Sequence, residues 1–145
     1  MPSGTQAYSN TGLAVDGTYT YRVRATNNVA PSAFSATATA NTIRPAAPSA
    51  LVATTVSATQ IDLVWHDNTA IETGFSVQRC SGQGCSTFTE IGTTVPDDTT
   101  YTDATALAET FYTYRVFAAN LAGNSASPSN SALANTRSPG VPASF

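Results

Sequence analysis

The feature that most constrains this chain is an internal repeat. Residues 18–27 (TYTYRVRATN) return as residues 111–120 (FYTYRVFAAN), with seven of the ten positions identical at an offset of 93. A period of this length is typical of one β-sandwich module, so the repeat sets the phase of the chain. We therefore expect the second half of one module over residues 1–43, a complete module over residues 48–136, and a linker followed by the start of a further module over residues 137–145.

A half sandwich has a physical cost. Strand alternation places Tyr19, Tyr21 and Val23 on one face, and each large apolar side chain left wet forgoes roughly 1.5–3 kcal/mol. Two interpretations are open: the chain is a window on a longer tandem array, or another chain completes the half module by adding strands. Residues 141–145 offer at most the start of a first strand, so even head-to-tail assembly would lack two strands. This favours the array.

Two Pro-rich segments lie at the expected module boundaries. The pattern P-x-x-P occurs at residues 45–48 and again at residues 139–142, 94 residues later. This pattern is also a ligand for small domains with aromatic grooves. Its repetition at the boundaries favours rigid extended linkers, the first over residues 44–47.

The composition excludes some functions. The net charge is −3 with six Arg and no Lys, which opposes nucleic-acid binding because that needs clustered basic residues. Charged residues are only 10% of the chain, so charge repulsion opposes self-association weakly. No apolar run approaches the length of a membrane span, which needs roughly 18 residues or more. The first residues lack the features of a signal peptide.

The complete module shows period-two alternation and no helical period. Ile61, Leu63 and Trp65 share one strand face, and Phe75 and Val77 share another. On the repeated strand the inward set is Tyr112, Tyr114, Val116 and Ala118. Seven strands are expected, at residues 49–56, 60–65, 74–80, 87–94, 100–104, 111–120 and 129–136.

Three stretches, taken in order, carry a family resemblance: LVWHDN at residues 63–68, ETGFSVQR at 72–79 and YTYRVFAANLAGNS at 112–125. Together they resemble a fibronectin type III module of the bacterial kind. The resemblance covers Pro48 to Thr136 completely and Tyr8 to Thr42 as a second half. This half is expected to supply three strands, the first around Tyr8, which matches Tyr101. It implies an all-β, seven-stranded, immunoglobulin-like sandwich in tandem repeats, with Trp65 in the core.

The resemblance also implies that Tyr112 and Tyr19 are corner tyrosines, whose hydroxyls bond back to the main chain. Leu107 lies five residues before Tyr112, whereas Leu13 lies six before Tyr19. This difference predicts that the turn before the repeated strand is one residue shorter in the complete module. The Arg-Gly-Asp tripeptide of some animal relatives does not occur.

Cys80 and Cys85 are the only cysteines, and they flank the turn SGQG. Thiols across a tight turn are close enough for a disulfide if their Cβ atoms face each other. A zinc or redox site is disfavoured because two Cys and one His cannot fill a zinc shell. We expect a disulfide, and hence an oxidising location outside the cell or at its surface.

The chain offers no convincing catalytic, cofactor or metal site. His66, the single histidine, has no G-x-S-x-G nucleophile motif to accompany it and is expected to be a solvated loop residue. Asp67, Asn68 and Glu72 share a loop and could hold calcium, but such residues more often fix turns. The same interpretation applies to Asp97, Asp98 and Asp103.

One candidate contact patch remains. Phe111, Arg115 and Phe117 are expected to face outward on the repeated strand, where exposed aromatics beside Arg favour a partner contact. The alternative is that Phe117 covers the Cys80–Cys85 bridge or a neighbouring strand. The half module has Thr18, Arg22 and Arg24 at the matching positions, so the aromatic character is expected in the complete module alone. Carbohydrate binding is less favoured, because the single Trp is expected to be buried.

The sequence thus predicts a non-enzymatic, secreted or cell-surface spacer, stalk or fibre element. Its partners would be neighbouring modules or copies of the same protein, with a surface protein or polysaccharide as further candidates. The main alternative is a filament subunit assembled by strand complementation between chains. A third is the accessory region of a secreted polysaccharide hydrolase.

Overall fold

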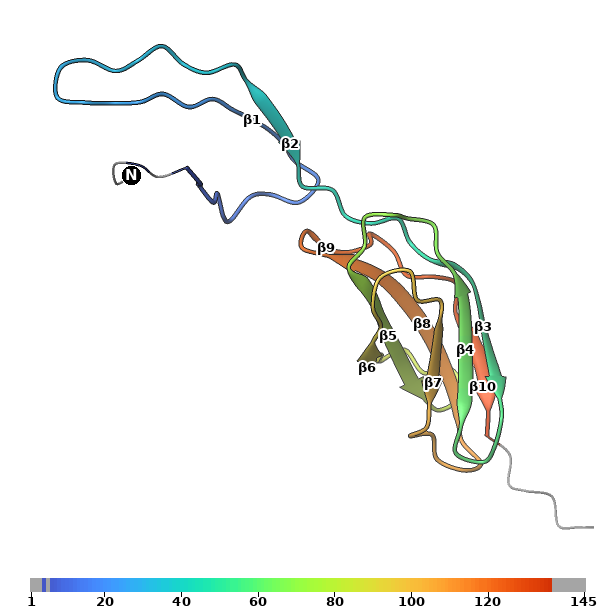
Figure 1. Ribbon diagram of the computed structural model, residues 1–145. Helices are drawn as coiled ribbons and strands as arrows, with labels where there is room; N and C mark the ends of the chain where they lie inside the picture. The colour runs from blue at the N-terminus through green and yellow to red at the C-terminus, as the bar shows by residue number, and fades with distance from the viewer. Residues whose placement is uncertain (1–3, 5, 137–145) are drawn as a thin grey trace, which may run out of the picture. The chain divides into compact units, whose positions relative to one another are not determined.

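The computed structural model describes residue 4 and residues 6–136, which form strands, turns and loops. The chain divides into two compact units, one ending at Ile43 and the other beginning at Arg44 (Figure 1). Among the described residues, no helix is long and apolar enough to cross a membrane. The second P-x-x-P segment, at residues 139–142, lies outside the described residues.

The second unit is a sandwich of two antiparallel sheets. One sheet has the order β3-β4-β7, formed by Ser49–Thr55, Ile61–His66 and Thr100–Asp103. The other has the order β10-β8-β5-β6, formed by Ala132–Asn135, Phe111–Asn120, Gly74–Ser81 and Thr89–Thr93. All seven expected strands are present, and the seven-stranded all-β fold is confirmed. A short β9 (Gly123–Asn124), which the sequence pattern did not predict, pairs with β8.

The core lies between these sheets and follows the alternation of the strands. Every second residue of β4 and of β8 is buried, which is the pattern of a strand with one wet face. The rings of Trp65 and Phe75 pack at a centroid distance of 5.5 Å and a tilted angle. The buried cluster consists of Leu51, Ile61, Leu63, Trp65, Phe75, Val77, Ala106, Tyr112, Tyr114, Val116, Ala118 and Ala132.

Asn130 closes one side of the sandwich. Its Oδ1 accepts a hydrogen bond from the Leu51 amide at 2.8 Å, and its Nδ2 donates to the Leu51 carbonyl at 2.9 Å. The Thr55 hydroxyl adds a bond to the Asn135 carbonyl at 3.0 Å. Side chains thus join β3 to the segment of β10, although these strands belong to different sheets.

The first P-x-x-P segment is attached to the second unit. Pro45 and Pro48 are buried, and Asn68 Nδ2 donates to the Ala47 carbonyl at 2.8 Å. The compact unit begins at Arg44. Ala47, the last residue of the expected linker, is therefore hydrogen-bonded to the module that follows it.

The first unit contains one hairpin, β1 (Thr18–Tyr21) paired with β2 (Ala38–Asn41). The strand expected around Tyr8, the counterpart of β7, is not formed. In the second unit β7 pairs only with β4, and the described residues of the first unit contain no counterpart of β4. The length of the repeated strand has the same explanation: β8 has ten residues because β5 pairs along it, whereas β1 has four.

Candidate functional site

Both units contain the corner tyrosine that the resemblance implied. The Tyr112 hydroxyl accepts a hydrogen bond from the Leu107 amide at 2.8 Å. The Tyr19 hydroxyl accepts one from the Ala14 amide at 2.7 Å. The spacing is five residues in each case, so the prediction of a shorter corner in the complete module is wrong. Ala14, and not Leu13, occupies the position of Leu107.

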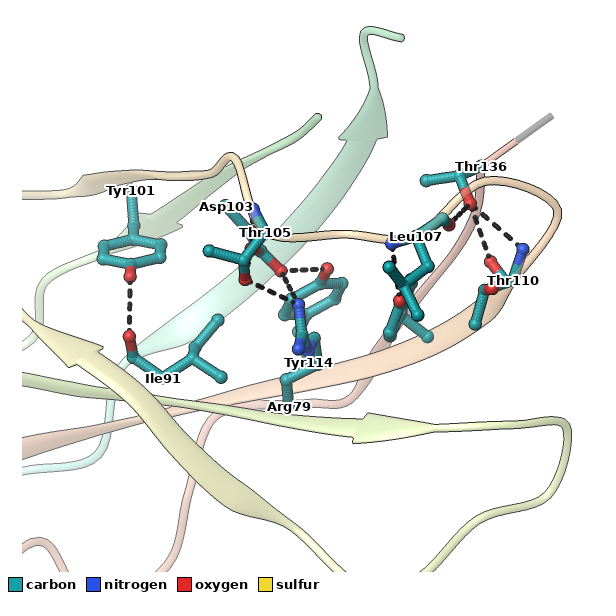
Figure 2. A network of polar contacts seen from close by, with 10 residues as sticks. Arg79, Ile91, Tyr101, Asp103, Thr105, Leu107, Thr110, Tyr114 and Thr136 are labelled. Atoms are coloured by element: carbon teal, nitrogen blue, oxygen red, sulfur yellow. Dashed lines mark hydrogen bonds and ion pairs between the residues drawn. The ribbon is translucent and has the colours of Figure 1, made fainter. Parts of the chain in front are cut away.

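A threonine completes each corner, and sequence reasoning missed it. Thr136 accepts from the Thr110 amide through Oγ1 at 3.1 Å and donates that hydroxyl to the Leu107 carbonyl (Figure 2). In the first unit, Thr42 accepts from the Gly17 amide at 3.0 Å and donates to the Ala14 carbonyl. The signal was present as the Asn-Thr pairs at residues 41–42 and 135–136.

Asp103 is the centre of a buried polar network. Figure 2 shows Arg79, Thr105 and Tyr114 converging on its carboxylate. Arg79 Nη1 lies 2.7 Å from Asp103 Oδ2, and the Tyr114 hydroxyl donates to the same oxygen at 2.8 Å. Thr105 donates to Oδ1 through its hydroxyl at 2.7 Å and its amide at 2.9 Å. Asp103 is 2% exposed, so this acid stabilises the sandwich and its oxygens are engaged by the protein itself.

The network sets the charge state of its members. Burial alone would raise the pKa of Asp103, but the hydrogen bonds from Thr105, Tyr114 and Arg79 outweigh it and hold that pKa below its usual value. Burial, together with the bond to Asp103, raises the pKa of Tyr114 far above its usual value. Burial also raises the pKa of Tyr101, whose hydroxyl donates to the Ile91 carbonyl at 2.9 Å. The network is therefore one carboxylate, one guanidinium and neutral phenols.

The expected disulfide is confirmed: Cys80 and Cys85 are bonded, with Cα atoms 6.0 Å apart. Cys80 lies on β5 opposite Thr113 of β8, and its side chain is buried. Phe117 lies opposite Ser76 instead. Of the two positions considered for Phe117, the structure therefore places it beside the neighbouring strand β5.

The outer face of β8 holds an arginine between two aromatic rings. The Arg115 guanidinium carbon lies 4.1 Å from the Phe88 ring centroid and 5.2 Å from that of Phe117. Arg115 Nε also donates to Gln78 Oε1 at 2.8 Å, which holds the guanidinium against the sheet. Phe111 lies further along the strand, opposite Asn135, and is 43% exposed. This arrangement is a preformed cation–π surface.

The first unit has a comparable cluster made from different residues. The guanidinium carbons of Arg22 and Arg24 lie 3.8 and 4.9 Å from the ring centroid of Phe34. Phe34 precedes Ser35, and Ser129 is the residue of the second unit that makes the same main-chain bonds as Ser35. The expectation that only the complete module has an aromatic surface beside Arg is therefore wrong.

The polar residues of this loop fall into two groups. Asn68 Oδ1 accepts a hydrogen bond from His66 Nδ1 at 2.9 Å. Its Nδ2 donates to the Ala47 carbonyl and the Ser49 hydroxyl, so Asn68 anchors the loop. Asp67 and Glu72 instead lie with Asp97, each offering a carboxylate oxygen within 4.8 Å of the others. Sequence reasoning grouped Asn68 with the first two, because it could not see that the loop of Asp97 folds against them.

The chain is similar in sequence to a known protein. Exoglucanase B of Cellulomonas fimi is 33% identical over an alignment 145 positions long, which covers 91% of this chain and 12% of that protein. The chain thus spans about an eighth of the length of this relative. No protein-family model matches the chain.

Among solved structures, a Fn3-like protein from Clostridium thermocellum is 28% identical with a TM-score of 0.53, over 61% of this chain and 90% of that one. The chicken CNTN1 FN1–FN3 domains are 20% identical with a TM-score of 0.61, over 90% of this chain and 46% of that one. The second likeness shows the fold alone. The seven-stranded unit therefore has a fibronectin type III-like fold.

Proposed function

We propose that this chain is a non-catalytic spacer segment of a longer tandem-module protein. The observation that carries the proposal is the repeated corner. The same tyrosine and threonine bonds form in both units, although the buried hydrophobic cluster of the described residues lies entirely in the second unit. Two copies of one structural module, joined through a Pro-containing segment, hold flanking parts of a protein at a distance. The mechanism is geometric and needs no cofactor.

The exposed inner face of the first unit supports completion by strands from outside residues 1–43. Tyr19 and Tyr21 are only half-buried, and Val23 is exposed. A hollow of about 570 Å³ is lined in part by Tyr21, Val23 and Phe34. The exoglucanase match favours preceding strands of the same polypeptide, since that relative carries its matching stretch inside a much longer chain.

The same match favours a secreted glycan-degrading enzyme as the parent protein. The disulfide supports an extracellular location, because such bonds persist in oxidising compartments. In this proposal the segment separates a catalytic domain from other parts of the enzyme. Its direct partners are its neighbouring modules.

The mass of the native protein under denaturing conditions tests the proposal. A mass several-fold above the 14.9 kDa of this chain supports the array. A mass near 14.9 kDa would overturn it and favour the filament, in which another chain covers Tyr19 and Tyr21. In that case sedimentation velocity should show concentration-dependent polymers.

A cellulose pull-down separates a spacer from a binding module. The spacer proposal predicts that the whole chain of 145 residues stays in the supernatant when crystalline cellulose is sedimented. Retention that is lost in the variant Phe111→Ser/Phe117→Ser, and kept in Phe34→Ser, would instead make the outer face of β8 a sugar-binding surface. That result would contradict a purely geometric role.

A further inference from the structure

Two loops at the same end of the sandwich bring three carboxylates together. Asp67 and Glu72 lie between β4 and β5, and Asp97 lies between β6 and β7. Their nearest carboxylate oxygens are all within 4.8 Å of one another. A hydrogen bond also joins the two loops: the main-chain amide of Asp97 donates to Glu72 Oε1 at 3.3 Å.

Glu72 is the member that points to a ligand. It is 8% exposed, and its second oxygen, Oε2, is buried with no hydrogen-bond partner among residue 4 and residues 6–136. A buried carboxylate oxygen without a partner is costly, because it has left water and gained nothing in exchange. The other two carboxylates make the cost greater, since like charges at this separation repel. A bound cation would satisfy Oε2 and reverse that repulsion.

We propose that Asp67, Glu72 and Asp97 bind a calcium ion. The donors are all carboxylate oxygens, which hard cations prefer, and the cluster contains no Cys or His that would favour zinc. Two oxygens bound to the same Ca²⁺ lie at most about 5 Å apart, given Ca–O distances of about 2.4 Å. The three carboxylate oxygens lie within 4.8 Å of one another, so they are close enough to share one ion. Magnesium is smaller and demands stricter octahedral geometry, which favours calcium here.

The ion would join two loops at the end where the Pro-containing segment enters the module. Asn68, in the same loop as Asp67 and Glu72, holds the Ala47 carbonyl at 2.8 Å and the Ser49 hydroxyl at 3.0 Å. Trp65, near the end of β4, donates its amide to the carbonyl of Thr99, two residues after Asp97. Calcium therefore stiffens the attachment of residues 45–48 to the sandwich.

Calorimetric titration and thermal melts of the whole chain test the site. With about 10 mM CaCl₂ in place of EDTA, we expect a saturable binding heat and a melting temperature about 5 °C higher, as for a site with millimolar affinity. The same concentration of MgCl₂ should give a clearly smaller shift. No heat and no shift with calcium, or an equal shift with magnesium, would overturn the proposal.

Glu72→Gln and Asp98→Asn are the matched variants. The glutamine can still accept from the Asp97 amide and can donate to a neighbouring carboxylate, so this variant should melt in EDTA no lower than the unchanged chain and lose the calcium shift. Asp98 follows Asp97 in the sequence but is not part of the carboxylate cluster. The Asp98→Asn variant should therefore keep the rise in melting temperature with calcium. Should Glu72→Gln not fold, Asp67→Asn replaces it, because its amide oxygen can still accept from Thr69. Equal calcium shifts in all variants would contradict the site.

Discussion

In the complete module Tyr112, Tyr114 and Val116 are at most 1% exposed, whereas Val23, the counterpart of Val116, is 63% exposed. Yet the two units share their local hydrogen bonds. Even the left-handed residue within the corner repeats, as Asp16 with φ 57° and Glu109 with φ 54°. The difference shows that this corner forms from bonds within one half of the sandwich, while burial of the tyrosines needs the other half.

A second difference concerns the charge at one repeated position. The Tyr114 hydroxyl bonds to Asp103, which also binds Arg79 of β5. The Tyr21 hydroxyl instead accepts from Asn10 Nδ2 at 3.2 Å, and Asn10 lies 93 residues before Asp103. A neutral amide at this place needs no arginine. The described residues of the first unit provide no strand equivalent to β5 that could carry one.

The largest expected difference in stability between the units comes from replacing Tyr114 and its counterpart Tyr21. Tyr114→Ala should cost the complete module about 4 kcal/mol, because it leaves a cavity in a packed core. Unfolding by denaturant, followed by the fluorescence of the single Trp, measures this module alone. Tyr21→Ala should change the amide protection of β1 by less than about 1 kcal/mol, since little packing is lost. Similar costs for both would mean that the first unit has a core of its own.

The next largest effect is expected from exchanging the charged and neutral residues at the repeated position, Asp103 and Asn10. Asp103→Asn should destabilise the complete module by about 3 kcal/mol, because Arg79 loses its charged partner. Asn10→Asp should stay within about 0.5 kcal/mol, because Asn10 is exposed. The same fluorescence and amide-exchange measurements apply. If Asp103→Asn were neutral, the network would not contribute to stability.

Reduction of the disulfide should have a moderate effect on one unit. The bond closes a loop with a sequence separation of 5, for which loop entropy gives about 2 kcal/mol. Dithiothreitol should lower the melting temperature of the complete module without unfolding it at room temperature, and leave the exchange of β1 unchanged. Two free thiols in the untreated chain would contradict the bond.

The smallest effect is a loss of stability at alkaline pH. The folded-state pKa of Tyr114 is raised above its ordinary value of 10.0, so the folded chain keeps its proton where the unfolded chain loses it. The stabilisation is complete below pH 10 and should fall by about 1 kcal/mol between pH 10 and pH 11. Unfolding midpoints across this range measure the slope. Tyr114→Phe should reduce it, and an unchanged slope would show that Tyr114 is not its source.

Much of the complete module could be predicted, because its strands alternate cleanly. Ile61, Leu63 and Trp65 identify an inward face by period alone, and the short turn between Cys80 and Cys85 indicates a bond. The polar core could not be found this way. Arg79 and Asp103 are far apart in sequence, and a charged residue at a strand end is equally typical of a turn. Only the packing of the two sheets against each other shows that the side chains of Arg79 and Asp103 both point inward.

The half module was harder to predict from the sequence, again because its structure depends on contacts between distant residues. The segment around Tyr8 has a strand-like sequence, but it has no partner strand to pair with among the described residues of its unit. Phe34 reaches Arg22 from the opposite side of a loop, where the complete module has Pro128. Asp97 joins Glu72 only after two loops fold together. Each of these features depends on contacts distant in sequence, which a repeat cannot reveal.

Hydrogen exchange of the whole chain, read at single amides, tests the central claim most directly. If the first unit is the second half of a module without its core, the amides of Tyr19 and Tyr21 should exchange orders of magnitude faster than those of Tyr112 and Tyr114. Equal protection at these four positions would contradict the account, because it would show that residues up to Ile43 form a stable fold by themselves.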